Sequence, residues 1–255
     1  MMRITDFPGL SFLLSFVLLW LSALFGSRVL RRWGGVDEAI RDNFGLIVAG
    51  ALTILGLIIG FSFSMAAGRY DQRKNYEEAE ANAIGTESLR ADLLPAADAA
   101  NVRALLRSYL DQRILFYTAR DEGRLAEINT RTAQLQAALW SSVLAPAAAQ
   151  PTAVAALAVS GMNDVLNSQG YTQAAWWNRL PRASWFLMVG IAVLSAMLLG
   201  WGARDVRSET SLLLVFPLIV AISFFLVADI DTPRGGVIRV SPQNLQSLAG
   251  SLRAP

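Results

Sequence analysis

Long uncharged stretches alternate with polar segments along the chain. Four of these stretches are both long and apolar enough to cross a bilayer, which takes about 20 apolar residues in a helix. They predict transmembrane spans at about residues 9–27, 44–67, 183–203 and 210–228. No stretch shows the sustained alternation of a β-strand. The pattern therefore predicts an all-α integral membrane protein with four transmembrane helices.

The region between the second and third spans has the pattern of a helical bundle. Its apolar side chains recur at steps of three and four residues, as they do on one face of a helix: Val102, Leu105, Leu106, Tyr109, Phe116, Tyr117, then Leu125, Ile128, Leu135, Leu139 and Val143. Residues 132–163 carry no charge, but they are rich in Ala and contain Pro146 and Pro151, which favours a helix–turn–helix over a fifth span. We therefore expect an extramembrane helical bundle inserted between spans two and three.

These elements predict four segments. Residues 1–68 form the first transmembrane hairpin, 69–182 a helical domain, 183–228 the second hairpin, closed by the short Arg204–Glu209 loop, and 229–255 a tail. Near the span ends, the side that holds the N-terminus, the middle domain and the tail carries eight basic residues, and the other side carries six. Because basic residues favour the cytoplasmic side, we expect the N-terminus, the middle domain and the tail in the cytoplasm.

Composition narrows the function. Charged residues make up 16% of the chain, against roughly 25% in soluble proteins. The net charge of +2 comes without a dense basic cluster, so we expect no nucleic-acid partner. The chain has no His and no Cys, which removes thiolate chemistry, Cys/His zinc sites and His-based triads. We therefore do not expect an enzyme, a catalytic residue or an organic cofactor.

Small residues recur on one face of the second span: Gly45, Ala49, Thr53, Gly56, Gly60, Ser64 and Gly68. Two interpretations remain open. In the first, this face packs on spans one, three and four of the same chain, since small residues let membrane helices approach closely. In the second, several copies surround a narrow pore with an apolar constriction. The pore-lining residues are then Thr53, Gly56, Gly60, Phe61, Phe63 and Ser64.

A charged segment continues the second span. Arg73 and Glu77, like Lys74 and Glu78, are four residues apart and are able to pair along a solvated helix surface. Alternatively, the segment places a ring of charge at a pore mouth, formed by Arg69, Asp71, Arg73, Glu77 and Glu80. The arginines favour anions and the glutamates favour cations, so the segment does not fix the sign of a permeant ion.

Two further groups of residues have alternative interpretations. Gly85 interrupts a helical segment, which indicates either close packing there or a polar site that uses Glu80, Asn82, Thr86 and Glu87. Asp229 and Asp231 follow the fourth span as Asp-x-Asp-x-Pro. They are an acidic helix stop, two ligands of a hard cation such as Ca²⁺, or partners of the basic residues after span two.

The segments Gly60–Ala66, Arg69–Arg73, Glu80–Thr86 and Asp229–Gly235 resemble the prokaryotic bestrophin-like membrane proteins. That family is distantly similar to the bestrophins, anion channels with four spans per subunit, five subunits, a pore lined by the second span and a calcium-sensing acidic cluster after the fourth. The resemblance implies a chloride-selective homo-oligomer, a pentamer by analogy, in the bacterial inner membrane. Its partners are then membrane lipid, further copies of the chain and inorganic ions. The alternative is a non-conducting membrane sensor or scaffold whose helical domain binds a partner.

Overall fold

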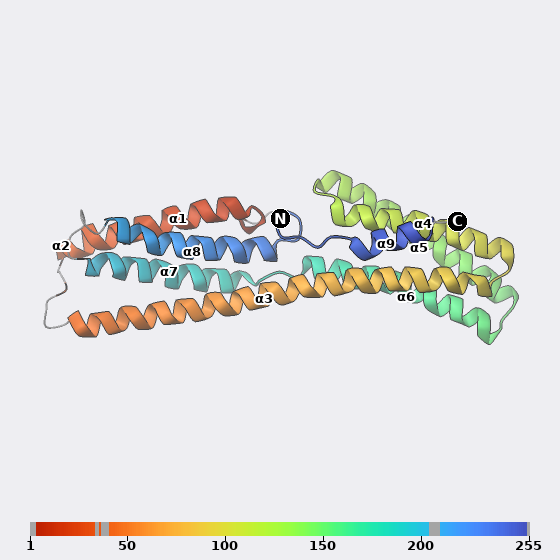
Figure 1. Cartoon of the computed structure of the whole chain (residues 1–255), viewed down its shortest axis with the longest axis horizontal. Coiled ribbons are helices and arrows are strands. Elements are labelled where there is room, and N and C mark those ends of the chain that lie inside the picture. Colours follow the sequence, from red (N-terminus) through yellow and green to blue (C-terminus); the bar gives the residue numbers. More distant parts are fainter. Residues whose placement is uncertain (1–3, 34–35, 37–40, 204–209, 254–255) are drawn as a thin grey trace. The chain divides into compact units, whose positions relative to one another are not determined.

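The computed structural model describes residues 4–33, 36, 41–203 and 210–253, and all regular elements in these ranges are helices (Figure 1). In chain order they are η1 (Ile4–Asp6), α1 (Pro8–Phe25), the π-helix η2 (Gly26–Leu30), α2 (Arg31–Trp33), α3 (Arg41–Arg90), η4 (Ala91–Leu93), α4 (Ala96–Thr118), α5 (Glu122–Ala149), α6 (Ala153–Trp177), α7 (Arg182–Gly202), α8 (Thr210–Asp231) and α9 (Gln243–Ser251). The all-α fold class is confirmed.

Within the described ranges, four helical segments are long and apolar enough to cross a membrane. They are Pro8–Leu30, Arg41–Leu93, Ala153–Gly202 and Leu213–Asp231. Each segment overlaps one of the four spans expected from the hydropathy pattern, so the number of spans is confirmed. The predicted Arg204–Glu209 loop lies outside the described residues.

Residues with strong boundary preferences define the polar helices. Pro95 precedes α4, where its fixed φ suits the helix start. The Asp121 side chain accepts a hydrogen bond from the backbone N–H of Arg124 and begins α5. Thr152 caps α6 in the same way through the N–H of Ala155. Because α5 ends at Ala149 and α6 begins at Ala153, the Ala-rich stretch is the helix–turn–helix that its composition predicts.

Contacts within the chain define two compact units. Unit 1 contains residues 1–69 and 179–238, and unit 2 contains residues 70–178 and 239–255. The helix α3, 50 residues long, contributes its apolar part to unit 1 and its polar part to unit 2. Each unit buries a core of its own.

Unit 1 packs α1, α7 and α8 against the apolar part of α3. Its core consists of Leu19, Ala23, Leu55, Met188, Ala192, Ala196, Val220 and Phe224. A Cβ atom added to Gly26 would overlap the carbonyl oxygen of Met197, and one added to Gly200 would overlap that of Ala23. The segments around Gly26 and Gly200 therefore touch through their backbones, a contact that only glycine permits.

Unit 2 buries the apolar faces of α4 and α5 that the spacing of three and four residues predicts. Val102, Leu106, Tyr109 and Phe116 are buried on α4, and Ile128, Leu135, Leu139 and Val143 are buried on α5. They join residues of α6 and α9, including Trp176 and Leu245, in one core. The rings of Phe116 and Trp176 meet edge to face with centroids 4.9 Å apart, a favoured aromatic geometry.

Candidate functional site

The small-residue face of α3 is not covered by its own chain. All seven of its residues, from Gly45 to Gly68, are exposed. A Cβ atom added at Gly45, Gly56, Gly60 or Gly68 would meet no atom within 4 Å. The interpretation that this face packs on the other spans of the same chain is therefore wrong.

A different face of α3 packs within unit 1. It consists of Val48, Leu55, Ser62 and Ala66, each at most 9% exposed. Successive residues of a helix are about 100° apart, so Gly60 lies about 140° around the axis from Leu55. The helix thus presents one face to its own chain and a nearly opposite face, made of small residues, to its surroundings.

The two phenylalanines beside the glycines lie on different sides of α3. Phe61 is 61% exposed and Phe63 is 39% exposed. Phe61 and Phe63 are two residues apart, which corresponds to about 200° of rotation around the helix. The two rings of one chain therefore point in different directions, and at most one of them faces a shared axis. Phe63, with Gly56 and Gly60, lines an apolar groove of about 520 Å³ whose other wall is α8, and Phe61 does not.

The structure contradicts the pore-mouth prediction for three of its five charged residues. Arg73 and Glu77 are 1% exposed and Glu80 is not exposed, because unit 2 covers all three. Side chains buried by their own chain do not form an open ring of charge. Asp71 is exposed as expected. Arg69 lies in unit 1, where its Nη1 is 3.9 Å from Oδ1 of Asp231, so the predicted pairing of these segments is confirmed there.

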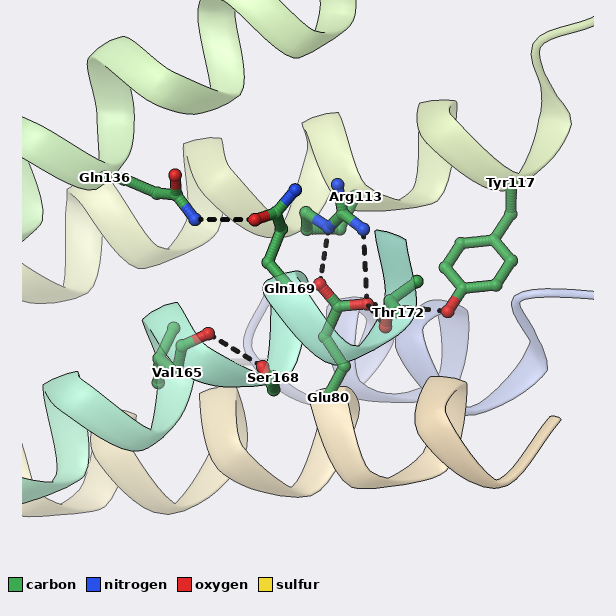
Figure 2. Close-up of polar contacts among 8 residues, drawn as sticks. All are labelled: Glu80, Arg113, Tyr117, Gln136, Val165, Ser168, Gln169 and Thr172. Atoms are coloured by element: carbon green, nitrogen blue, oxygen red, sulfur yellow. Dashed lines mark hydrogen bonds and ion pairs between the residues drawn. The ribbon is translucent and has the colours of Figure 1, made fainter. Parts of the chain in front are cut away.

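Glu80 is the centre of a buried polar network between α3, α4 and α6 (Figure 2). Arg113 donates from Nε to one carboxylate oxygen and from Nη2 to the other. Tyr117 Oη and Thr172 Oγ1 also donate to Oε2 of Glu80, at 3.5 and 3.2 Å. The guanidinium carbon of Arg113 lies 4.5 Å from the Phe116 ring centroid, in cation–π range. The network therefore joins three helices through one carboxylate.

Charge is retained inside this network. Burial alone would lower the pKa of Arg113, but the Glu80 carboxylate outweighs burial and raises it. The pKa values of Tyr109 and Tyr117 are also raised, first by burial and then by the charge of Glu80. The Arg113 guanidinium thus remains charged and both phenols remain neutral at ordinary pH.

Glu77 holds the beginning of α9 in unit 2. Its carboxylate accepts hydrogen bonds from Nδ2 of Asn244 at 2.6 Å and from the backbone N–H of Leu245 at 2.9 Å. About two helical turns further along α3, a Cβ atom on Gly85 would lie 3.2 Å from Leu248 Cδ1. The close packing that Gly85 predicts is therefore present, and its neighbour is α9.

Glu87 is a second fully buried carboxylate of α3. Neither of its oxygens has a hydrogen-bond partner among the described residues. The side chain lies against Gly161 of α6, beside Arg90, whose Nη1 is 3.9 Å from Asp164. Burial raises the pKa of Glu87 to about 8, so the group is mainly neutral at pH 7. The alternative polar site is not assembled, because Asn82 and Thr86 are exposed while Glu80 and Glu87 are buried.

Asp229 and Asp231 bind backbone N–H groups. Asp229 accepts from Val237 and Ile238 at 2.7 and 2.8 Å, which closes the turn after α8. Asp231 accepts from Leu180 at 3.0 Å. The two carboxylates serve different segments, and the described residues contain no group of three or more acidic, His or Cys side chains able to hold a metal ion. This arrangement does not support the calcium-site hypothesis.

Fold and site together define a class of protein. The chain is an all-helical, multi-span membrane protein whose second span continues as the same helix into a polar helical unit. A family model described as a Bestrophin-like domain matches residues 10–245. The chain belongs to the Bestrophin-like family.

Solved structures have the same fold. A bacterial bestrophin homolog from Klebsiella pneumoniae superposes with a TM-score of 0.62 at 15% sequence identity, covering 96% of each chain. Another crystal structure of a bestrophin homolog from that organism gives a TM-score of 0.63 at 14% identity, covering 95% of this chain and 94% of the other. No curated protein matches the chain in sequence.

Proposed function

We propose that the chain is one subunit of a homo-oligomeric ion channel, and that the small-residue face of α3 lines its pore. One observation carries the proposal: this face is exposed along its whole length, while the opposite face of α3 packs on unit 1. Thr53, Gly56, Gly60 and Ser64 would face the axis, with Phe63 at the edge of the pore wall. A ring of copies would give these residues close helix neighbours and a shared path.

Self-association also accounts for the groove beside this face. Its lining is almost entirely apolar and includes Phe63, Phe216 and Val220. In a ring, apolar side chains of the neighbouring subunit would pack on the α8 side of this groove, while Gly56 and Gly60 face the axis. We take five subunits as the working number, by analogy with the bestrophins.

The residues expected from the sequence at the pore mouth are partly buried, so a ring of charge there would use other residues of α3. Eighteen residues make five turns of an α-helix, so Lys74 lies on the same line of α3 as Gly56, and Glu78 on the same line as Gly60. Both are exposed, as is Asp71. We assign the charges at the pore mouth to Asp71, Lys74 and Glu78, in place of Arg73, Glu77 and Glu80.

Family membership favours an anion, with chloride as the first candidate. We place the channel in the inner membrane, with the N-terminus, residues 69–182 and the tail in the cytoplasm, as the basic residues near the span ends favour. The transmembrane hairpins would then be residues 1–68 and 183–228.

The test is ion flux through liposomes that contain the purified protein. We expect chloride efflux in the wild type and its loss in Gly60→Trp, because an indole would fill the axis. Ile54→Trp is the matched control, since Ile54 is an exposed position of α3 about 120° away from Gly60. Equal flux in both variants would show that this face does not line the path.

Two measurements separate the remaining alternatives. Lys74→Glu should lower the chloride-to-potassium permeability ratio, and Lys74→Arg should preserve it. Cross-linking that yields only monomers or dimers, with no flux of either ion, would favour a non-conducting scaffold whose unit 2 binds a partner.

A further inference from the structure

A second apolar groove lies at one end of the membrane helices of unit 1. It has a volume of about 500 Å³ and is lined by the end of α7, the beginnings of α3 and α8, and Ala23 of α1. Its walls are almost entirely apolar, and they include Phe44, Gly45, Leu199, Leu213 and Phe216. Volumes of about 300–1,000 Å³ are typical of small-molecule sites.

We expect the groove to end near the lipid headgroups, because its lining includes the end of α7 and the beginnings of α3 and α8. The rings of Phe44 and Trp201 pack edge to face there with centroids 5.4 Å apart. Tryptophan is enriched at the boundary between membrane and water. Since the groove lies within membrane-spanning helices, its natural occupant is an acyl chain. Water is disfavoured in an apolar groove of this kind, because it would find few hydrogen-bond partners there.

Two arginines give this end of the groove a positive charge. Nη1 of Arg31 donates to the carbonyl oxygen of Ala203, a lining residue, at 3.1 Å. A guanidinium has five N–H donors, so this bond leaves others for a second acceptor. Arg41 is one turn before Phe44 and Gly45, which places it on the groove side of α3. Arg31 is exposed and Arg41 is half-buried.

We propose that this groove binds an anionic phospholipid, with one acyl chain between α3, α7 and α8 and the phosphate at Arg31 and Arg41. The argument is complementarity: an apolar channel closed by two cations matches a lipid with a negative headgroup. The planar guanidinium suits phosphate in particular. The site does not depend on whether the protein conducts ions.

The experiment is native mass spectrometry of the full chain in detergent, titrated with dioleoyl phosphatidylglycerol or dioleoyl phosphatidylcholine. Replacing both Arg31 and Arg41 by Gln should weaken phosphatidylglycerol binding about 30-fold, because both guanidinium charges that pair with the phosphate are removed. Phosphatidylcholine binding should change little. Arg32→Gln is the matched control, because Arg32 is an exposed neighbour of Arg31 with no described contact to the groove.

A second pair of variants tests the acyl-chain position. Gly45→Phe should narrow the groove and weaken binding of both lipids, because Gly45 lines the groove and an added Cβ there meets no atom within 4 Å. Gly50→Phe, equally open but outside the groove, should bind both lipids normally.

The proposal also predicts a gain. Asp42 is an exposed acidic residue next to Arg41. Its negative charge opposes an anionic headgroup, so Asp42→Asn should bind phosphatidylglycerol more tightly, and this variant tests the site even if the double arginine variant does not fold. Three results would overturn the proposal. They are equal affinity for the two lipids, an equal loss of phosphatidylglycerol affinity in Arg32→Gln and in the double arginine variant, and unchanged affinity in Asp42→Asn. A Gly45→Phe variant that keeps its lipid but changes oligomeric state would also overturn it, since a second copy would then occupy the groove.

Discussion

Breaking the buried Glu80–Arg113 pair should destabilise the protein strongly. In Glu80→Met, Arg113 keeps its charge at a position with no solvent exposure, and Tyr117 and Thr172 lose their acceptor. Removing one partner of a buried ion pair costs about 3–5 kcal/mol. Replacing both partners with Met should cost far less, because no charge is then left buried without a counter-charge.

The measurement is thermal unfolding of the detergent-purified protein, followed by tryptophan fluorescence. Trp176 packs on Phe116 in the same core and should report the transition. At about 2–4 °C per kcal/mol, Glu80→Met should lower the Tm by roughly 6–20 °C. Asp111→Asn, which breaks the solvent-exposed pair with Arg253, is the control and should shift the Tm by about 4 °C or less.

The double variant decides the question. If Glu80→Met/Arg113→Met loses as much stability as the two single variants added together, the two side chains are not energetically coupled. If Glu80→Met is no worse than Asp111→Asn, the network does not stabilise unit 2.

Three further predictions concern other contacts. Gly200→Leu should prevent α7 from approaching α1 and reduce the folded yield in detergent, whereas Gly190→Leu, where an added Cβ meets nothing within 4 Å, should be tolerated; equal yields would contradict the backbone contact. Glu87→Gln should raise the Tm, and the gain should grow between about pH 4.5 and pH 8. The Glu87 carboxyl loses its proton near pH 4.5 in the unfolded state but keeps it up to about pH 8 in the folded state, so the wild type loses stability across this range and the Gln variant does not. A gain independent of pH would refute the buried neutral acid. Asp229→Ala should speed hydrogen exchange at the amides of Val237 and Ile238 while leaving the Leu180 amide, which Asp231 holds, protected; uniform exchange would argue against separate anchors.

Much of the fold could be predicted from local patterns. The spans follow from long uncharged stretches, and the unit 2 helices follow from apolar spacing interrupted at Pro95 and at Gln150–Thr152. These signals are local, since a helix needs only its own sequence to define its length and its apolar face.

The positions of the charged residues could not be predicted in the same way. Glu80 and Arg113 are 33 residues apart, and Glu77 and Asn244 are 167 apart. A charged residue on a polar helix usually faces water, so nothing near Glu80 in the sequence indicates burial. The small residues of α3 posed the opposite difficulty: glycine at helical spacing suits a packed face and an open face equally, and only the tertiary contacts of Val48 and Leu55 distinguish them.

The open face of α3 has a practical consequence, because the chain contains no cysteine. Single thiols introduced from Thr53 to Ser64 would be the only reactive sulfhydryls in the molecule, without any prior removal of native ones. At Gly56 and Gly60 an added Cβ meets no atom of the same subunit within 4 Å, so methanethiosulfonate reagents or nitroxide spin labels have room to attach there. Distances between identical labels would then report how many subunits assemble and how far apart their second spans stand.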